Sequence, residues 1–408
     1  MATMKILHIN AINDVKSTGR ICKELASVHH DCGHETRVAH STGPVTEASY
    51  VIGDPVDVKL HALHARITGR QGYASRFATE NLVRDIERYA PDVVHLHNLH
   101  ANYVHLRTLF EYLAARDIPT VLTLHDCWFF TGKCTHYTTA GCNKWQHGCG
   151  DCPQLRDDIP SWLFDRTSEM LDDKRRWLTA IPRLAVVGVS DWITTEARFS
   201  FLRHAAVLRR IHNWVDLDVF RPVDATELRV RLQLADKMVL LGVASTWSEA
   251  KGLGAFLDLA AARPNDAFLL IGRLDDTELP DNVIHVNETN DARELARYYA
   301  LADVFLNLSE QESFGNVTVE AMACGTPVLV LDATASPELV TDDTGVVVAT
   351  RGLTDLNYGI ERIFARGKRS YKDACVTHAR TNFALRDRAI DYLDVYAALR
   401  HEKVRNIL

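Results

Sequence analysis

The chain has 408 residues, of which 47% are hydrophobic and 24% charged, and its formal net charge at pH 7 is -7. Because this length exceeds what one ordinary hydrophobic core serves, two domains are expected. The negative balance argues against nucleic acid as the main partner, since a phosphate backbone attracts a basic face. The first residues lack the pattern of a signal peptide, and no apolar run approaches the roughly 20 residues that cross a bilayer. A cytoplasmic protein is therefore expected.

In the first half of the chain, short apolar runs alternate with helical patterns. The first run is KILHIN (5–10), and the helical pattern after it, with Ile21, Leu25 and Val28 on one face, ends at Gly33. Later strand-like runs are TRVAH (36–40), DVVHLHN (92–98), TVLTLHD (120–126) and LAVVGVS (184–190). Continuous apolar runs separated by helices predict a parallel sheet that is covered on both faces.

The second half repeats this alternation. Its strand-like runs are MVLLGVAS (238–245), AFLLIGR (267–273), DVFLNL (303–308) and PVLVLD (327–332). Between the halves, IHNWVDLDVFRP (211–222) has the Asn, Asp and Pro residues of a linker. The predicted architecture is α/β, with two doubly wound, Rossmann-like parallel-sheet domains facing a cleft and ligands at the carboxyl ends of the strands.

Two common nucleotide-binding motifs are missing from the sequence. Neither opening strand is followed by G-x-G-x-x-G, because the nearest text, GLGAFL (252–257), lacks the third glycine. The sequence has no G-x-x-x-x-G-K-[ST] either. A nicotinamide dehydrogenase is therefore disfavoured and a P-loop kinase or ATPase is excluded.

The segment ESFGNVTVEAMACGTPVLV (312–330) predicts a phosphate-binding turn. A helix is expected over about 316–324, with Gly325 as its stop and Pro327 preventing its continuation. At the positive end of this helix, three backbone N–H groups suit a phosphate: those of Gly315, Asn316 and Val317.

Two glutamates flank the start of this predicted helix. Glu312 lies on the loop beside the phosphate seat and can hydrogen-bond a group attached to the phosphate. Glu320 lies about one turn into the helix, where its carboxylate can accept from a vicinal diol such as a ribose. On spacing alone, the alternative is an amphipathic helix with two solvated glutamates.

The same segment resembles the glutamate–seven residues–glutamate motif of retaining glycosyltransferases of family 4, which have the two-domain GT-B fold. The resemblance covers nearly the whole chain, and IHNWVDLDVF (211–220) is similar to the interdomain signature of the family. PDVVHLHNLHANY (91–103) and TVLTLHDCWFFTGKC (120–134) resemble bacterial enzymes of colanic-acid, capsule and exopolysaccharide assembly. The implied activity is a retaining hexosyl transfer from a nucleotide sugar, preferably a UDP-sugar, to a glycan or polyprenyl-linked acceptor of a surface polysaccharide.

The resemblance also implies site residues. It assigns Glu312 to the donor sugar and to catalysis, and Glu320 to the ribose. The residues implied to line the sugar and phosphates are Ser313, Phe314, Gly315, Asn316 and Val317. NDVKSTGR (13–20) resembles the glycine loop under the diphosphate, in which Gly19 permits close approach, with a plain strand–helix turn as the alternative. His125 falls where the family places a histidine near the reacting sugar; a satisfied histidine of the cleft wall is the alternative.

The cations for the diphosphate depart from the family pattern. The R…KG element of the family has the sequence GVASTWSEAKGLG (242–254) here, which supplies Lys251 but no arginine. Ser245 and Thr246 stand in that region. Because hydroxyl groups replace a bidentate, charge-assisted contact, either Arg273 compensates or turnover is slow.

Retention of the anomeric configuration needs a covalent intermediate or attack on the face of the leaving group. The motif holds no convincing nucleophile, so front-face attack is expected, with the departing phosphate oxygen taking the acceptor proton. No D-x-D element stands where a metal-dependent transferase holds Mn²⁺, so catalysis without a divalent ion is expected.

Two clusters offer metal ligands. Four cysteines lie in CTHYTTAGCNKWQHGCGDC (134–152), namely Cys134, Cys142, Cys149 and Cys152. They fit either a tetrahedral structural zinc or unligated, redox-labile thiols, and a catalytic zinc is not expected because four thiolates leave no open position. In HLHNLHANYVH (95–105), strand alternation places His95 and His97 on one face, but no carboxylate supports a metal site.

Residues 59–79, KLHALHARITGRQGYASRFAT, contain four Lys or Arg residues and no acidic residue. This composition fits either a solvated loop and helix or a basic amphipathic surface that contacts anionic lipid. The second interpretation places the protein at the inner face of the cell membrane.

The predicted domains are an acceptor-binding domain (1–213) with a Cys-rich insertion (127–153), a nucleotide-sugar donor-binding domain (214–384), and a C-terminal helix (385–408) that packs back towards the first. Two other functions stay open. One is a sugar-nucleotide epimerase with the GT-B fold, which the context EAMACGTPV disfavours. The other is a catalytically weak scaffold, which the missing arginine suggests.

Overall fold

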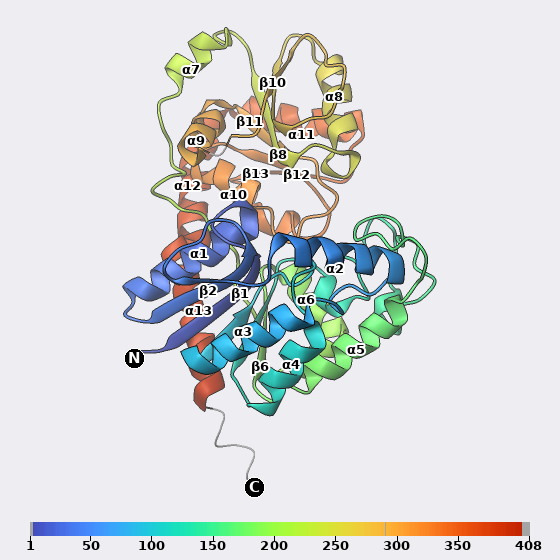
Figure 1. The fold of residues 1–408 in the computed structure, drawn as a ribbon. Coiled ribbons are helices and arrows are strands. Elements are labelled where there is room, and N and C mark those ends of the chain that lie inside the picture. The colour runs from blue at the N-terminus through green and yellow to red at the C-terminus, as the bar shows by residue number, and fades with distance from the viewer. Residues whose placement is uncertain (1–2, 290, 402–408) are drawn as a thin grey trace. The chain divides into compact units, whose positions relative to one another are not determined.

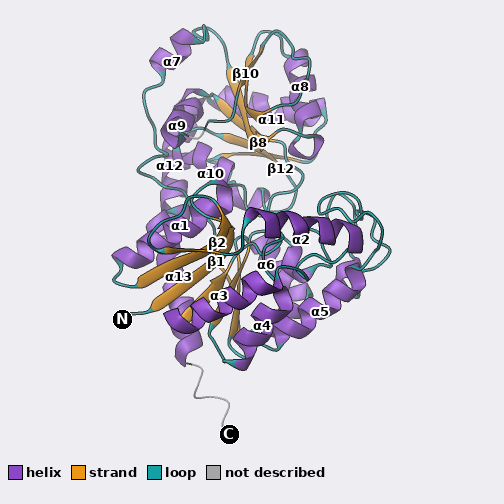
Figure 2. Cartoon of the chain, viewed as in Figure 1, coloured by secondary structure: helices purple, strands orange, loops and turns teal. Residues whose placement is uncertain are grey.

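The computed structural model describes residues 3–289 and 291–401. These residues form two compact units, the second of which spans residues 212–385, while the first contains the rest of the described chain. Figure 1 shows the course of the chain, and Figure 2 shows a sheet with surrounding helices in each unit.

The first unit contains a seven-stranded parallel sheet of order β3-β2-β1-β4-β5-β6-β7. Its strands are β1 (Lys5–Ile12), β2 (Glu35–Thr42), β3 (Ser49–Val51), β4 (Val93–Leu96), β5 (Thr120–Leu124), β6 (Leu184–Gly188) and β7 (Val207–Arg210). Its helices are α1 (Lys16–Asp31), α2 (Pro55–Thr68), α3 (Arg76–Tyr89), α4 (Leu106–Ala115), α5 (Thr167–Thr179), α6 (Asp191–Phe199) and α13 (Leu385–His401), the last from its second residue on, with short 3₁₀ turns η1 (Trp128–Phe130), η2 (Lys144–Gln146) and η3 (Phe201–His204).

Helices cover both faces of this sheet, which explains why β4, β5 and β6 are buried along their whole length. On one face, α1 and α13 pack together: His29 Nε2 lies 2.8 Å from the carbonyl oxygen of Ala389. On the other face, Arg37 of β2 reaches Asp85 of α3 at 3.1 Å. The chain therefore returns to the first unit with α13 after the second unit is complete.

The second unit contains a six-stranded parallel sheet of order β10-β9-β8-β11-β12-β13. Its strands are β8 (Val239–Thr246), β9 (Ala267–Arg273), β10 (Val283–Val286), β11 (Val304–Asn307), β12 (Val328–Leu331) and β13 (Gly345–Val348). Its helices are α7 (Thr226–Arg231), α8 (Leu253–Ala262), α9 (Ala292–Leu301), α10 (Asn316–Ala323), α11 (Leu353–Arg366) and α12 (Lys368–Phe383), with 3₁₀ turns η4 (Glu249–Lys251) and η5 (Pro337–Leu339).

The predicted α/β fold with two doubly wound parallel sheets is confirmed. In each sheet the strand order reverses once, between β1 and β4 in the first and between β8 and β11 in the second. Ligands of such sheets bind outside the carboxyl ends of the strands at this switch point. None of the helices in residues 3–289 and 291–401 is long and apolar enough to cross a membrane.

Candidate functional site

The loops at the switch point of the second sheet carry most of the predicted donor-site residues. After β8 the chain forms η4, and after β11 it forms the loop 308–315 that leads into α10. The two loops pack closely at Gly252, which has φ +82° and where a Cβ would lie 2.6 Å from the carbonyl oxygen of Leu308. Only glycine suits both this conformation and this contact.

This packing brings together two of the predicted residues, Lys251 and Glu312. The ammonium of Lys251 donates to Glu312 Oε1 at 2.7 Å and to Ser309 Oγ at 3.4 Å. The Glu312 side chain is only 15% exposed, and its backbone N–H donates to Thr334 Oγ1 at 2.9 Å. This part of the second unit thus holds a cation and a carboxylate side by side.

Arg351, which sequence analysis missed, holds the two loops together. Its guanidinium donates to the carbonyl oxygens of Leu308 at 2.8 Å, Glu249 at 2.9 Å and Ala250 at 2.8 Å. It also pairs with Glu310 at 3.3 Å. No sequence signal could have found it, because its main partners are backbone carbonyls that belong to no motif.

The turn before α10 leaves the start of the helix without a side-chain cap in the described part of the chain. Gly315 adopts φ +101° there. Asn307 supports the turn from β11, with its Nδ2 donating to Thr318 Oγ1 at 3.0 Å. The ring of Phe314 packs on His212 and Phe383, with centroids 5.7 Å from each. Ser313 is buried in the same turn, while Asn316 and Val317 are half-buried.

Glu320 lies inside the unit, with a relative exposure of 4%. Its Oε2 accepts a hydrogen bond from the hydroxyl of Tyr299 at 3.0 Å. Since Glu312 is also largely buried, the alternative of two solvated glutamates is wrong.

The other predicted diphosphate contacts lie at the end of β8 and β9. Ser245 and Thr246 are exposed. The Arg273 side chain is 58% exposed and pairs with Glu288 at 3.3 Å, while its Nε donates to the carbonyl oxygen of Ser245 at 3.4 Å. Arg273 thus contacts Glu288 and Ser245 rather than the Lys251–Glu312 pair.

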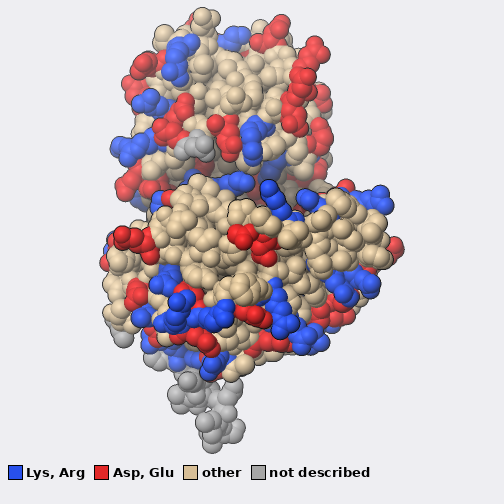
Figure 3. Space-filling model, in the orientation of Figure 1, with Lys and Arg blue, Asp and Glu red and all other residues tan. Residues whose placement is uncertain are grey.

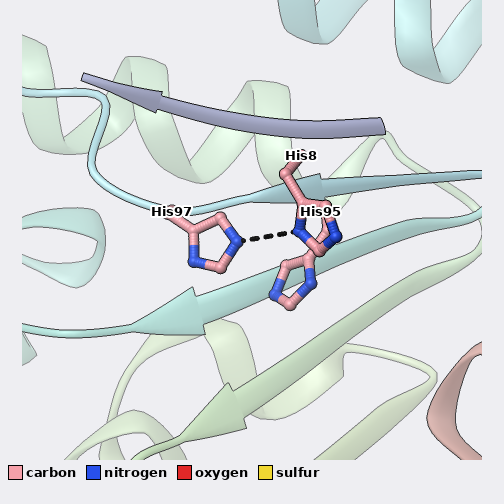
Figure 4. A group of neighbouring side chains, drawn as sticks. All are labelled: His8, His95 and His97. Carbon is pink, nitrogen blue, oxygen red and sulfur yellow. Dashed lines mark hydrogen bonds between the residues drawn. The ribbon is translucent and has the colours of Figure 1, made fainter. Parts of the chain in front are cut away.

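In the first unit, a chain of buried histidines ends at His125. His8 Nδ1 lies 3.2 Å from His97 Nε2, and His97 Nδ1 lies 3.0 Å from His125 Nε2 (Figure 4 shows the first of these contacts). Burial lowers the pKa of His8 to about 3 and that of His125 to about 4, so these rings are neutral at pH 7.

The neutral rings have coupled tautomers, because each carries one N–H. His8 Nε2 is buried without a hydrogen-bond partner among the described residues. An orphaned N–H is rarer in buried sites than an orphaned acceptor, so we assign the bare nitrogen to His8 Nε2. His8 then donates to His97 and His97 to His125, which leaves the N–H of His125 on Nδ1.

His8, His95 and His97 each offer a nitrogen within 4.8 Å of the others (Figure 4). His95 Nδ1, however, lies 2.7 Å from the hydroxyl of Tyr396, and its Nε2 lies 2.7 Å from Thr123 Oγ1. Both nitrogens of His95 thus take part in hydrogen bonds, one to α13 and one to the neighbouring strand β5.

Three further features of the first unit concern predicted residues or their neighbours. The next residue, Asp126, lies 2.9 Å from His100 Nε2. Burial lowers the pKa of His100, but the Asp126 carboxylate outweighs it and the net shift is upwards. Gly19 lies in the first turn of α1, where a Cβ would be 3.2 Å from the backbone N of Asp14 at the turn after β1. The four cysteines of the predicted cluster belong to the chain segment that connects β5 with α5, and they line one small cavity.

The sequence matches two family descriptions, Glycosyltransferase Family 4 over residues 18–219 and Glycosyl transferases group 1 over residues 227–380. The D-inositol 3-phosphate glycosyltransferase of Mycobacterium sp. (strain KMS) is 31% identical over 364 residues, covering 81% of each chain. The putative colanic acid biosynthesis glycosyl transferase WcaC of Escherichia coli (strain K12) is 24% identical over 302 residues, covering 67% of this chain and 68% of WcaC.

Solved structures show the same fold. Anabaena Alr3699/HepE in complex with UDP and glucose has a TM-score of 0.67 and 17% identity, over 97% of this chain and 100% of that chain. The two parallel-sheet units are those of the GT-B glycosyltransferase class. Within that class, the chain belongs to glycosyltransferase family 4, as the motif resemblance predicts.

Proposed function

We propose that the protein is a retaining hexosyltransferase that moves a sugar from a UDP-sugar to a glycan or polyprenyl-linked acceptor in bacterial surface-polysaccharide synthesis. The observation that carries the proposal is the Lys251–Glu312 pair beside the start of α10, at the switch point of a doubly wound sheet. Two comparisons support it. The complex of Alr3699/HepE with UDP and glucose supports the UDP-sugar donor, and the name of WcaC, a putative colanic acid biosynthesis glycosyl transferase, supports the polysaccharide role.

The diphosphate of the donor is proposed to lie at the N-terminus of α10. Peptide N–H groups and the helix dipole favour an anion there, and Lys251 adds a point charge. Because Glu312 and Ser309 already hold the ammonium, binding costs less side-chain ordering. Glu312 accepts from the sugar, and Glu320, held by Tyr299, accepts from the ribose diol.

Transfer is proposed to occur on one face of the sugar. The bond from the anomeric carbon to the phosphate oxygen breaks, the acceptor oxygen bonds to that carbon, and the departing oxygen takes the acceptor proton. Lys251 faces the charge that grows on the leaving diphosphate. We assign no divalent ion to this step, because no D-x-D element stands where a metal-dependent transferase holds Mn²⁺; the D-L-D of residues 216–218 lies in the linker segment 211–222. With Arg273 engaged by Glu288, turnover is expected to be slow.

His125 is proposed to act as a hydrogen-bond donor in this reaction. Its pKa of about 4 leaves the ring neutral at pH 7, and its link to His97 directs the N–H of Nδ1 outward from the chain of histidines. A neutral donor of this kind orients a hydroxyl group of a sugar without adding a charge.

We also propose that the first unit contacts anionic lipid at the inner face of the membrane through α2. Four apolar side chains at helical spacing form one exposed face of this helix, with exposures between 38% and 64%: Val56, Leu60, Leu63 and Ile67. Residues 162–164, Trp-Leu-Phe, extend this apolar face, and the N–H of Trp162 donates to the carbonyl oxygen of Arg66.

The charges beside this face suit an anionic lipid. Lys59 and Arg66 are exposed on α2. Figure 3 shows basic side chains, with some acidic ones, beside uncharged surface in the part of the first unit where Figure 1 places α2 and α5. Apolar side chains that enter the headgroup region together with Lys and Arg give a peripheral contact.

Replacing Leu60 with glutamate should weaken binding to vesicles that contain phosphatidylglycerol by roughly ten-fold or more, the equivalent of burying one leucine. Co-sedimentation measures the bound fraction. The control is Val230→Glu, which changes an equally exposed apolar residue on α7. Equal binding of both variants, or equal binding of the wild type to uncharged vesicles, contradicts the proposal.

The nucleotide specificity is tested by thermal shift and calorimetry with UDP, GDP and ADP. A ligand at 100 times its Kd stabilises the folded state by about 2.7 kcal/mol, so UDP should raise Tm measurably. Glu320→Gln should weaken UDP binding roughly 10- to 100-fold, since it removes charge-assisted hydrogen bonds to the ribose. Glu227→Gln, on the exposed face of α7, is the control.

Two outcomes contradict the transferase. Absence of binding at millimolar nucleotide indicates a scaffold. Release of free UDP from a UDP-sugar with epimerisation, and without any acceptor, indicates the epimerase.

A further inference from the structure

The segment between β5 and α5 has little regular structure besides η1 and η2. Four of its cysteines, widely spaced along this segment, nevertheless line one cavity of about 20 Å³, namely Cys134, Cys142, Cys149 and Cys152. A cavity of this size holds a single atom of about the size of water. The fold therefore gathers four thiols around the space of one small ligand.

One hydrogen-bond donor points at these sulfurs, since Gln154 Nε2 donates to Cys134 Sγ at 3.6 Å. Gly132 lets the chain pack closely here, because a Cβ there would lie 3.1 Å from the Cβ of Cys149 and 2.6 Å from the carbonyl oxygen of Thr167. Such a donor suits a thiolate, which is a strong acceptor, better than a thiol.

Two buried lysines stand beside the cysteines. Lys133 is 4% exposed and donates to the carbonyl oxygens of Leu155 at 2.8 Å and Ile159 at 2.7 Å. Lys174 is 1% exposed, donates to the carbonyl oxygen of Trp128 at 2.5 Å and lies over its ring. Lys133 interacts electrostatically with Cys134 and Cys152, and Lys174 with Cys134 and Cys149.

Carboxylates act on these ammonium groups only from a distance: Asp157 and Asp158 on Lys133, and Asp126 on Lys174. Among the described residues, neither lysine forms an ion pair with a carboxylate within 4.0 Å. A buried charge without a partner is costly. A divalent ion with four thiolates carries a net charge of -2, which two ammonium groups balance.

We infer that Cys134, Cys142, Cys149 and Cys152 bind one structural Zn²⁺ as a tetrathiolate, with Lys133 and Lys174 as its counter-charges. The ion enters as the four thiols release four protons to solvent, and no other reactant is needed. Zn–S bonds of about 2.3 Å place the sulfurs roughly 3.8 Å apart in a tetrahedron. Among the described residues no three of these sulfurs yet lie within 4.8 Å of one another, so binding draws the segment inward.

The site is structural because four protein ligands leave no open coordination position. Its place in the chain still links it to the candidate site. Cys134 follows η1, whose first residue, Trp128, donates its N–H to Asp126 Oδ1 at 2.9 Å, next to His125. Zinc would thus fix the segment that begins at the end of β5.

The test is the metal content of the full-length protein, purified under reducing conditions and measured by mass spectrometry of the elements. We expect one zinc per chain, and replacement by Co²⁺ should give the intense visible bands of tetrahedral cobalt with thiolate charge transfer. Cys142→Ser should lose most of the zinc. Cys32→Ser, a half-buried thiol outside the cluster, should retain it.

A second variant keeps the test decisive if Cys142→Ser misfolds. Lys174→Met removes one counter-charge but no ligand, and should weaken zinc binding against a competing chelator roughly 10- to 100-fold. Three results overturn the inference: a metal-free wild type with four freely reactive thiols, a disulfide between Cys134 and Cys152 in its place, or unchanged zinc affinity in Lys174→Met.

Discussion

Replacing Glu312 with glutamine is expected to lower kcat roughly 10²- to 10³-fold while changing the Kd for UDP little. Glutamine preserves the shape of the side chain but removes the negative charge that holds the Lys251 ammonium at 2.7 Å and faces the donor sugar. Groups that act on charge developing in the transition state have effects of this size. Steady-state kinetics with a UDP-sugar, together with calorimetry for UDP, separates the two quantities.

The matched control is Glu310→Gln, two residues earlier on the same loop. Glu310 pairs with Arg351 at 3.3 Å and its side chain is 46% exposed, so its loss should leave kcat within a few-fold of the wild type. A Glu312→Gln enzyme with wild-type kcat, or one that has lost UDP binding instead, contradicts the assigned role.

Acid is expected to unfold the first unit well before the carboxylates titrate. Burial lowers the pKa of several histidines in this unit, and six of them the most: His8 and His61 to about 3, His29 and His125 to about 4, and His95 and His97 well below 6.5. Each is neutral in the folded state but takes up a proton on unfolding once the pH falls below 6.5. Stability therefore decreases as the pH falls, by about 1.4 kcal/mol per histidine at one unit below 6.5.

Together these groups remove on the order of 8 kcal/mol at pH 5.5, which is comparable with the whole stability of a typical domain. His100 opposes them, because its pKa is raised, but it is a single group. Urea unfolding at pH 7.5 and pH 5.5, followed by circular dichroism, measures the difference. The second unit gives an internal comparison if the two transitions separate.

Neighbouring residues on α1 supply the control for this effect. His29 is buried and His30 is exposed. His29→Gln should reduce the pH dependence of stability by about one proton, and His30→Gln, at the exposed neighbouring position, is the variant against which it is compared. The slope is compared rather than the absolute stability, because His29→Gln also alters the contact with Ala389. Equal slopes in both variants contradict the explanation.

The buried centre of each sheet could be predicted from the sequence because apolar runs such as 120–126 and 267–273 need no partner to be recognised. The short edge strands β3, β7, β10 and β13 were not predicted. Three of them are partly exposed, namely β3, β7 and β10, so the buried pattern that marks a central strand is absent there. Strand β13, GVVV, is apolar and mostly buried but only four residues long. The conformation of these strands depends on the neighbouring strand rather than on their own composition.

The candidate site also has parts that the sequence predicts and parts that it does not. Helix α10 was predicted to within one residue, because Gly315 and Gly325 mark its ends. The role of Arg351 and the hydrogen bond from Tyr299 to Glu320 could not be predicted, since both join segments that are distant in sequence. For the histidines, the alternation of 95 and 97 was visible, but their partner His8 comes from another strand.

The return of α13 to the first unit has a consequence for protein synthesis. Tyr392 and Tyr396 are buried against β4 and β5, so part of the first core leaves the ribosome after the entire second unit. While residues 212–385 are being translated, the nascent first unit exposes the apolar face that α13 later covers. During that interval the first unit is the part of the chain most prone to aggregate and most in need of chaperones, although it was synthesised first.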